Sequence, residues 1–262
     1  MPRTRLPHAA PAPPGKDDID FAAVLPPPGP RRRRRPRDAS SPVYGSPRGR
    51  LLEVRDVLGA VLCDIDGVLR TWDDAERWRP VLEVALRPDL LRPAVTGAIT
   101  DEEWRAAVRA ELPAAQRALA DAWAGPAGIG RVDPELVRLL REVRRKVPVV
   151  LVSNGTTRLE ADLAGLGIAD LADAVVNSAR VKAAKPEPAI YRIAARRAGV
   201  AAARCLFVDD SLENVQAARR AGMTGVHYQG TGPLREMLVP LMQMAAIRGD
   251  RSARHSEEGS TA

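Results

Sequence analysis

The sequence predicts an α/β fold, a doubly wound parallel sheet with a small helical insert after the first strand. Three observations support this prediction. Short apolar runs alternate with helical patterns from residue 59 onward, three of these runs end in polar or acidic residues, and the alternation is interrupted once, between residues 71 and 130. Alternating strands and helices form a sheet that is covered by helices on both faces. The 262 residues are enough for one such domain with an insert.

The strands are expected at five short apolar runs. An apolar run without polar alternation is typical of a strand that is buried on both faces of a parallel sheet. The runs span residues 59–64, 147–154, 174–176, 204–210 and 224–228.

Helices are expected between these strands, at residues 134–146, 158–166, 187–198 and 213–221. Asp133 can cap the first of them, because Asp is favoured at the N-cap and Pro134 suits the first turn. Gly222 gives the last of them a stop signal. This order of elements indicates a Rossmann-like sheet, whose ligands bind at the carboxyl ends of the strands.

The segment 71–130 breaks the alternation and carries no strand signal. Thr100 and Glu103 form a capping box that predicts the start of a helix before Trp104. We therefore expect a small helical cap. All four tryptophans of the chain lie in this segment: Trp72, Trp78, Trp104 and Trp123. Two interpretations stay open, that they form the core of the insert or that one or two of them line a substrate pocket.

The N-terminal residues 1–50 differ in composition from the rest. They hold 12 of the 23 prolines and 11 basic against four acidic residues, which accounts for the whole net charge of +7. Such a segment cannot bury enough apolar surface to fold, so we expect a disordered tail. The run Arg31–Arg35 is either a solvated part of this tail or an arm for nucleic acid or an acidic partner. Nucleic acid is expected only through this arm, because the remaining residues carry equal numbers of basic and acidic groups.

The expected division of the chain follows from these patterns. Residues 51–70 and 131–245 form the α/β core, residues 71–130 form the cap, and residues 246–262 form a flexible C-terminal tail. No apolar run approaches the roughly 20 residues of a membrane helix, and the N-terminus lacks a secretory signal. Cys63 and Cys205 lie in apolar strands and are expected to be buried, reduced thiols. We expect a cytoplasmic protein without membrane contact, and the sequence leaves its oligomeric state open.

The segment Asp64-Ile65-Asp66-Gly67 gives the strongest chemical signal. Gly67 allows the chain to turn directly after the strand, so that both carboxylates can face one site. A carboxylate nucleophile beside a carboxyl acid/base suits phosphoryl transfer. Two neighbouring acids repel each other, so a cation is expected, and oxygen ligands favour Mg²⁺.

Three further elements follow in order along the chain. Ser153 and Asn154 end a strand and open a helix, where a hydroxyl and free backbone N–H groups can hold a phosphate. Lys185 is one of only four lysines and precedes a helix, where it supplies a compact positive charge. Asp209 and Asp210 end another strand and can complete a metal site.

These four elements resemble the four motifs of the haloacid dehalogenase-like hydrolase superfamily, over roughly residues 55–240. The resemblance implies that Asp64 becomes an aspartyl phosphate, and that Asp66 protonates the leaving group and then activates water. It also implies a phosphate site and a magnesium site. The phosphate site would consist of Ser153, the Asn154 backbone and Lys185. The Mg²⁺ site would consist of Asp64, the Asp66 backbone carbonyl and Asp210, and Asp209 would contact these ligands or bind the ion through water.

Within that superfamily the residues favour a phosphatase. Enzymes that cleave carbon–halogen bonds typically have an aromatic residue where Asp66 stands. Phosphonate cleavage needs a lysine in the cap, and residues 71–130 contain none. Sugar-phosphate mutases use a cap histidine, which is also lacking. The sequence therefore predicts a Mg²⁺-dependent phosphomonoesterase for a small phosphorylated metabolite.

Two other classes of function remain as alternatives. One is a non-catalytic binding module on the same fold, and the other is binding of nucleic acid or an acidic partner through Arg31–Arg35. One position departs from the motifs, because relatives often have glycine where this chain has Lys182. Three interpretations of that lysine stay open: a solvated side chain, a change in the shape of the loop, or a second cation near the mouth of the site.

Overall fold

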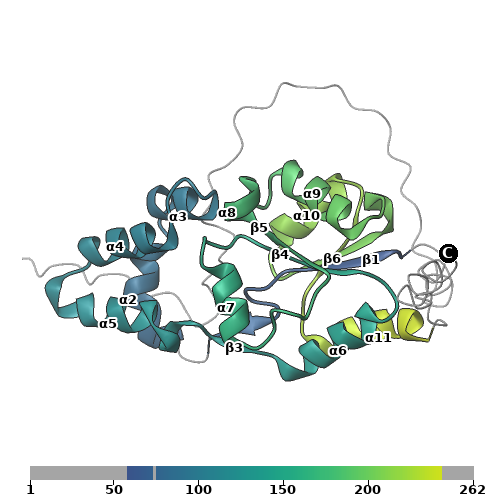
Figure 1. Cartoon of the computed structure of the whole chain (residues 1–262), viewed down its shortest axis with the longest axis horizontal. Coiled ribbons are helices and arrows are strands. Elements are labelled where there is room, and N and C mark those ends of the chain that lie inside the picture. The colour runs from purple at the N-terminus through teal and green to yellow at the C-terminus, as the bar shows by residue number, and fades with distance from the viewer. Residues whose placement is uncertain (1–57, 73–74, 244–262) are drawn as a thin grey trace, which may run out of the picture.

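The computed structural model describes residues 58–72 and 75–243. The expected N-terminal tail, the Arg31–Arg35 arm and the C-terminal tail 246–262 lie outside the described residues. All five expected strands are present in the described part, each within two residues of its predicted bounds (Figure 1). They are β1 (Ala60–Cys63), β4 (Val149–Ser153), β5 (Ala174–Asn177), β6 (Cys205–Asp209) and β7 (Thr224–His227).

The five strands form one parallel sheet in the order β5-β4-β1-β6-β7. Strand β1 lies at the centre, with Val61 opposite Val149 of β4 and Leu206 of β6. Every residue of these three strands is buried, which explains their continuous apolar runs. Because neighbouring strands are parallel, their carboxyl ends meet at one edge of the sheet. The predicted fold class is confirmed.

Helices cover both faces of the sheet. On one face, Val61 and Cys63 pack with α6 (Pro134–Arg144), α7 (Leu159–Gly165) and α11 (Thr231–Met242). On the other, Ala60 and Leu62 pack with α9 (Pro188–Ala198) and α10 (Leu212–Arg220), which follow the short helix α8 (Ser178–Val181) and the turn η3 (Ala202–Arg204). Alternate residues of β1 therefore belong to different apolar clusters, as strand geometry requires.

Helix α11 was not among the predicted helices. Its sequence begins Thr-Gly-Pro and contains Pro240, and these residue types are poor helix formers. It forms nonetheless because Leu234, Leu238 and Leu241 lie on one face and are buried against α6. Tertiary packing here outweighs the intrinsic preference of the sequence.

The insert is helical, as predicted, and lies at one end of the sheet (Figure 1). It contains α2 (Ala75–Ala85), α3 (Pro88–Val95), α4 (Asp101–Glu111) and α5 (Arg117–Ala124), with the turns η1 (Ala114–Gln116) and η2 (Pro126–Gly128). The capping box of Thr100 and Glu103 is present. At the base, β2 (Arg70–Thr71) pairs with β3 (Arg131–Val132) in antiparallel fashion. The expectation of no strand is wrong at Thr71, because a two-residue strand is too short to show alternation.

Three of the four tryptophans form an apolar core of the insert. Trp78, Trp104 and Trp123 are buried in one cluster, and the rings of the last two meet edge to face with centroids 5.3 Å apart. Trp72 lies at the base, where its Nε1 donates to the Gly128 carbonyl at 3.0 Å. The interpretation as an internal core therefore holds for three of the four.

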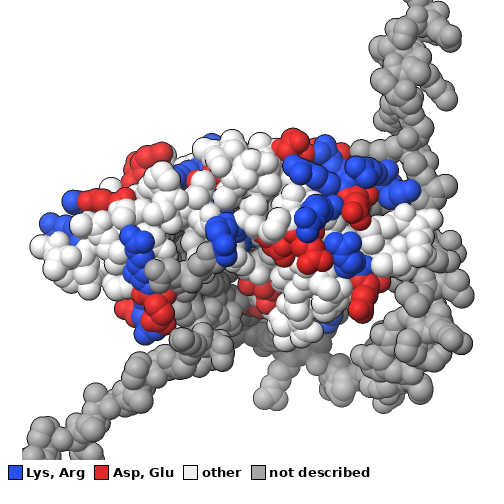
Figure 2. All heavy atoms as spheres, turned by 90° about the horizontal axis from the view of Figure 1, so that it is seen from below, with Lys and Arg blue, Asp and Glu red and all other residues white. Residues whose placement is uncertain are grey.

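The charges of the described part are mixed. Figure 2 shows basic and acidic side chains next to each other on the face that it views. Arg235 lies 3.4 Å from Glu135, and Arg144 lies 3.3 Å from Asp173. Cys63 and Cys205 are buried and unpaired in their strands, as predicted. Among residues 58–72 and 75–243, no helix is long and apolar enough to cross a membrane.

Candidate active site

The carboxyl edge of the sheet gathers the predicted site residues. Asp64 directly follows β1, Ser153 ends β4, and Asp209 ends β6, with Asp210 as the next residue. Lys185 comes from the loop between α8 and α9. The structure thus brings together residues that are up to 146 positions apart in the chain.

Lys185 is the centre of this group. Its Nζ lies 2.6 Å from Asp64 Oδ1 and 2.8 Å from Asp209 Oδ2, and its side chain is only 2% exposed. Burial acts to lower the pKa of Lys185, but the two carboxylates raise it more, so the net shift is upward. The ammonium group therefore stays charged and is shared by two buried acids.

The Asn154 side chain fixes the loop that carries Lys185. Its Nδ2 donates to the Lys185 carbonyl at 2.9 Å, and its Oδ1 accepts from the Lys185 backbone N–H at 2.7 Å. The peptide bond between Lys185 and Pro186 is cis. Asn154 was expected to act through its backbone, so the contact of its side chain is a further function of the same residue.

Ser153 presents an unsatisfied polar group at the same edge. The residue is 1% exposed, and its Oγ is buried without a hydrogen-bond partner among the described residues. An unpaired buried hydroxyl costs about 1–3 kcal/mol. Such a group suits a site that is completed by a ligand with acceptor oxygens, as a phosphate has.

Three carboxylates at this edge fit a divalent cation. One oxygen each of Asp64, Asp209 and Asp210 lies within 4.8 Å of the others. Lys185 offsets only one of these three charges. Burial, followed by the charge of Asp209, raises the pKa of both Asp64 and Asp210. Hard oxygen ligands with excess negative charge are the donor set that Mg²⁺ prefers.

The three acids differ in how much of their binding capacity is used. Asp209 Oδ1 accepts from the Ser211 N–H at 2.9 Å and from Asn214 Nδ2 at 3.1 Å, while its Oδ2 contacts Lys185. Asp209 is thus engaged in positioning its neighbours. Asp210 lies against Gly67, where an added Cβ would come within 2.0 Å of its Oδ2. Gly67 also has a φ of +84°, so both space and backbone conformation require glycine there.

The Asp66 side chain is not part of the cluster of three carboxylates, although its charge contributes to the raised pKa of Asp64 and Asp210. Asp66 Oδ1 accepts from Arg70 Nε at 2.6 Å, and the Asp66 side chain is 35% exposed. Arg70 also contacts Asp162 at 3.3 Å, which in turn lies 2.8 Å from Arg158. Arg70 and Asp162 were not among the predicted site residues, although the spacing of four positions between Asp66 and Arg70 could have indicated their ion pair.

Lys182 is an exposed side chain, as the solvated interpretation expects, and it also makes a contact that the sequence did not indicate. It ends α8 with a φ of 58°, a left-handed conformation that favours glycine. Its Nζ donates a hydrogen bond to the carbonyl of Gly97 in the insert. Gly97 itself lies so close to α8 that an added Cβ would be 2.1 Å from the Ala179 carbonyl oxygen. Lys182 therefore joins the core to the insert.

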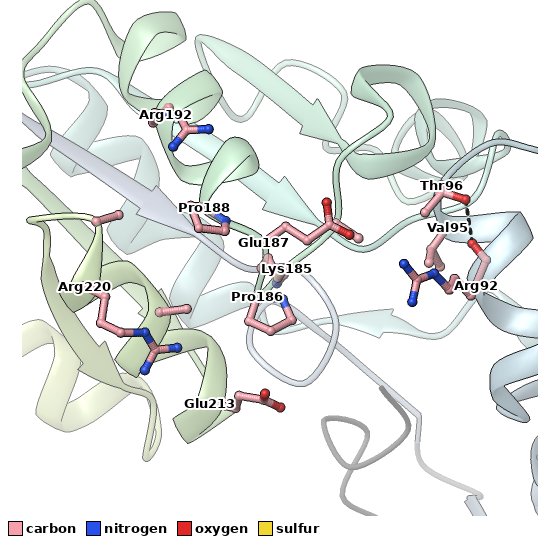
Figure 3. Close-up of a pocket in the computed structure, with 13 residues that line it drawn as sticks. Arg92, Val95, Thr96, Lys185, Pro186, Glu187, Pro188, Arg192, Glu213 and Arg220 are labelled. Carbon is pink, nitrogen blue, oxygen red and sulfur yellow. Dashed lines mark hydrogen bonds between the residues drawn. The ribbon is translucent and has the colours of Figure 1, made fainter. Parts of the chain in front are cut away.

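A cleft of about 510 Å³ lies next to the site, between α3 of the insert and helices α9 and α10 (Figure 3). Pro186 and Lys185 form part of its wall, and Arg92, Arg192 and Arg220 line it from three different helices. The acids Asp64 and Asp210 and the hydroxyl of Ser153 are not part of its lining. The cleft therefore adjoins the Lys185 loop, and the carboxylates that line it are Glu187 and Glu213, not those of the site.

Comparison with known proteins places the chain in one family of hydrolases. Residues 58–222 match the haloacid dehalogenase-like hydrolases. Phosphatase MT3486 of Mycobacterium tuberculosis is 34% identical over 118 residues, 44% of this chain and 54% of that protein. Fructose-1-phosphate phosphatase YqaB of Escherichia coli is 35% identical over 97 residues, 36% of this chain and 52% of that protein. The chain spans about half the length of these two relatives.

A solved structure supports the same fold. The HAD family enzyme BT-2542 of Bacteroides thetaiotaomicron, in complex with magnesium and inorganic phosphate, aligns with a TM-score of 0.54 at 23% identity. The alignment covers 64% of this chain and 92% of that one.

Proposed function

The chain belongs to the haloacid dehalogenase-like hydrolases, and on this basis we propose that it is a Mg²⁺-dependent phosphomonoesterase. The observation that carries the proposal is the group of Asp64, Lys185 and the acids after β6, beside the unsatisfied hydroxyl of Ser153. A nucleophile, a fixed cation and a seat for anionic oxygens thus share one edge of the sheet. Phosphoryl transfer needs these three features.

The proposed first step forms an aspartyl phosphate. A carboxylate oxygen of Asp64 attacks the phosphorus, and the bond from phosphorus to the leaving-group oxygen breaks. Asp66 gives its proton to that oxygen, which leaves as an alcohol. Arg70 holds the Asp66 side chain at the turn after β1, where its partial exposure leaves it open to a leaving group.

The second step reverses the role of Asp66. Its carboxylate takes a proton from a water molecule, the water oxygen bonds to phosphorus, and the bond from phosphorus to Asp64 breaks. This releases inorganic phosphate and restores the free Asp64 carboxylate. Lys185, the Ser153 hydroxyl and the Asn154 backbone stabilise charge on the phosphoryl oxygens in both steps.

Magnesium would be held by Asp64, Asp210 and the Asp66 backbone carbonyl, and when bound it supplies positive charge that stabilises the transferring phosphoryl group. Asp209 is proposed as a positioning residue, because the hydrogen bonds of its carboxylate hold Lys185 and the start of α10. Oxygen ligands and uncompensated negative charge support this assignment.

The helical segment 71–130 is proposed to act as a cap over the core of residues 51–70 and 131–245. A cap over the carboxyl edge would exclude water and limit the substrate to a small phosphorylated metabolite. Relatives named as phosphatases of fructose 1-phosphate and of phosphoglycolate support this substrate class. We further propose that the protein acts in the cytoplasm.

The test is phosphate release by the full chain from an aryl phosphate and from a panel of phosphorylated metabolites. We expect turnover with Mg²⁺, loss on chelation by EDTA, and a loss of at least about 10³-fold in Asp64→Asn. Asp210→Asn should raise the Mg²⁺ concentration that gives half-maximal activity. Activity that survives in Asp64→Asn, or no turnover across the whole panel, would overturn the proposal.

A further inference from the structure

Within residues 58–72 and 75–243, side chains link the insert to the core by hydrogen bonds at three places besides the two connecting strands. Lys182 donates to the Gly97 carbonyl, Arg158 donates to the Ala124 carbonyl, and Asp101 contacts the segment after β4. In the first two contacts the insert contributes only a backbone oxygen. The third uses a charged side chain of the insert, so it depends directly on residue identity.

Asp101 is a buried acid that the catalytic proposal does not use. It is the first residue of α4 and is 2% exposed. Its Oδ1 accepts from Thr156 Oγ1 at 2.6 Å, and its Oδ2 accepts from Arg105 Nε at 2.6 Å. Its backbone N–H donates to Thr157 Oγ1 at 2.9 Å. One residue of the insert thus makes two hydrogen bonds to consecutive threonines of the core.

These threonines continue the loop of Ser153 and Asn154. Only Gly155 separates that pair from Thr156. The far side of the threonine segment is also fixed, because the Thr156 carbonyl accepts from Asn177 Nδ2 at 2.8 Å and the Thr157 carbonyl accepts from Arg180 at 2.8 Å. Side chains of the core therefore bond to the backbone carbonyls of this segment, while Asp101 of the insert bonds to both of its hydroxyls.

We propose that Asp101 is a positioning residue that couples docking of the insert to the geometry of the phosphate site, an inference that rests on the proposed phosphatase function. When the insert is docked, Asp101 fixes the two threonines and with them the end of the loop that begins at Ser153. When it is not docked, the Asp101 carboxylate and the threonine hydroxyls lose each other as partners and are hydrated instead. Because the docked contact includes a charge-assisted hydrogen bond, the docked insert and the ordered loop stabilise each other.

The contacts of Asp101 and Arg105 also allow the coupling to be followed by tryptophan fluorescence. Arg105, which holds the second oxygen of Asp101, lies 4.3 Å from the ring centroid of Trp123 and donates to its carbonyl at 3.1 Å. All four tryptophans of the chain lie between residues 72 and 123. Three of them form the core of the insert, and Trp72 lies at its base with its ring centroid 5.1 Å from the Arg70 guanidinium. Tryptophan emission therefore reports on the insert and on its junction with the core, while phosphate would bind at the carboxyl edge of the sheet. A change in emission on phosphate binding measures communication between the two.

The experiment uses the full chain with Mg²⁺ and inorganic phosphate as the probe. The variants are Asp101→Asn from the insert side, Thr156→Val from the core side, and Thr156→Ser as the conservative rescue. Asp121→Asn is the matched control, because Asp121 is an acid of the same insert that is 56% exposed and pairs with Arg109. The measured quantities are kcat, KM, the inhibition constant of phosphate, the emission change and the melting temperature.

We expect Asp101→Asn and Thr156→Val each to raise the inhibition constant of phosphate and to lower kcat/KM by about tenfold, and to abolish the emission change. Their double variant should be little worse than either single one, because both remove the same contact. Thr156→Ser should restore the values to within about twofold, and Asp121→Asn should match the wild type.

Two results separate this inference from the proposed function. If the wild type hydrolyses phosphate esters but the two variants retain its phosphate inhibition constant and emission change, only the coupling is overturned. A fall in melting temperature with those two values unchanged means that the contact is purely structural, and it also overturns the coupling. If the wild type neither turns over substrate nor binds phosphate, both proposals fall together.

Discussion

The sheet core and the helical insert differ in what they bury: the core buries charged side chains at its carboxyl edge, whereas the insert buries mainly aromatic and aliphatic side chains. At the carboxyl edge of the core, Lys185 is a buried cation within hydrogen-bonding distance of two buried acids, Asp64 and Asp209. The insert is built on an aromatic and aliphatic cluster around Trp78, Trp104 and Trp123. Desolvating charges is unfavourable unless they are paired, so the core accepts a cost that the insert avoids.

The insert also contains an ion pair with a buried acid, which is an exception to its apolar interior. Asp101 is buried there together with its partner Arg105, and it lies where the insert meets the segment after Ser153. Buried charge in both regions is thus found next to the proposed phosphate site. Apolar burial stabilises each region, and buried charge positions the groups that would act on substrate.

The largest expected effect, because it reaches both stability and turnover, comes from removing the shared cation of the core. Lys185→Met leaves Asp64 and Asp209 buried and facing each other, which should cost about 3 kcal/mol and lower the melting temperature by about 6–12 °C. Turnover should fall by about 10³-fold. Acidification should recover part of the lost stability, because burial raises the pKa of Asp64 and protonating it removes the repulsion. Thermal melts at several pH values and steady-state kinetics test this.

The matched control is Lys182→Met, three residues earlier in the chain. That lysine is exposed and contacts only a carbonyl of the insert, so its loss should change the melting temperature by no more than a few degrees. Equal losses of stability in the two variants would contradict the contrast between a buried shared charge and a surface contact.

We also expect the insert to unfold separately from the core when its own apolar cluster is weakened. Leu139→Ala in α6 and Trp123→Ala in α5 each remove a large buried side chain, at a cost of about 2–5 kcal/mol. In Leu139→Ala, tryptophan emission and far-ultraviolet circular dichroism should report one transition. In Trp123→Ala, emission from the remaining tryptophans of the insert should change at a lower temperature than the dichroism. Coincident transitions in both variants would mean that insert and core form one cooperative unit.

The sequence predicted the sheet and the strand ends of the site for a simple physical reason. A parallel strand buried on both faces leaves an uninterrupted apolar run, and the polar residue that follows it stands at the binding edge. Asp64, Ser153 and Asp209 could therefore be located in advance. Asn177 ends β5 in the same manner and now holds the Thr156 carbonyl, so the same rule could have identified it.

Other features could not be predicted, because their partners are remote in sequence. Asp101 and Thr156 are separated by 55 positions, and the acid looks like an ordinary first-turn residue of an amphipathic helix. The left-handed conformation of Lys182 and its contact with Gly97 likewise depend on how the insert packs on α8. Helix α11 shows a related limit, since packing outweighs its unfavourable prolines.

The smallest expected effect on stability comes from removing a helix cap in each of the two regions. Asp133 caps α6 of the core and also accepts from Thr231 of α11 at 2.7 Å, while Thr100 caps α4 of the insert. Replacing either residue by alanine should cost about 1 kcal/mol.

Only the core cap should depend on pH. Although burial acts to raise it, the hydrogen bonds from Thr231 and from two backbone N–H groups lower the pKa of Asp133 below its ordinary value of 3.8. Its contribution is therefore complete above that value and is lost as the pH falls through the lower pKa of the folded state. Melting curves between pH 3 and pH 7 should show the difference between Asp133→Ala and the wild type shrinking on the acid side, while the difference for Thr100→Ala stays constant. A constant difference for both caps would mean that Asp133 acts through its shape and not through its charge.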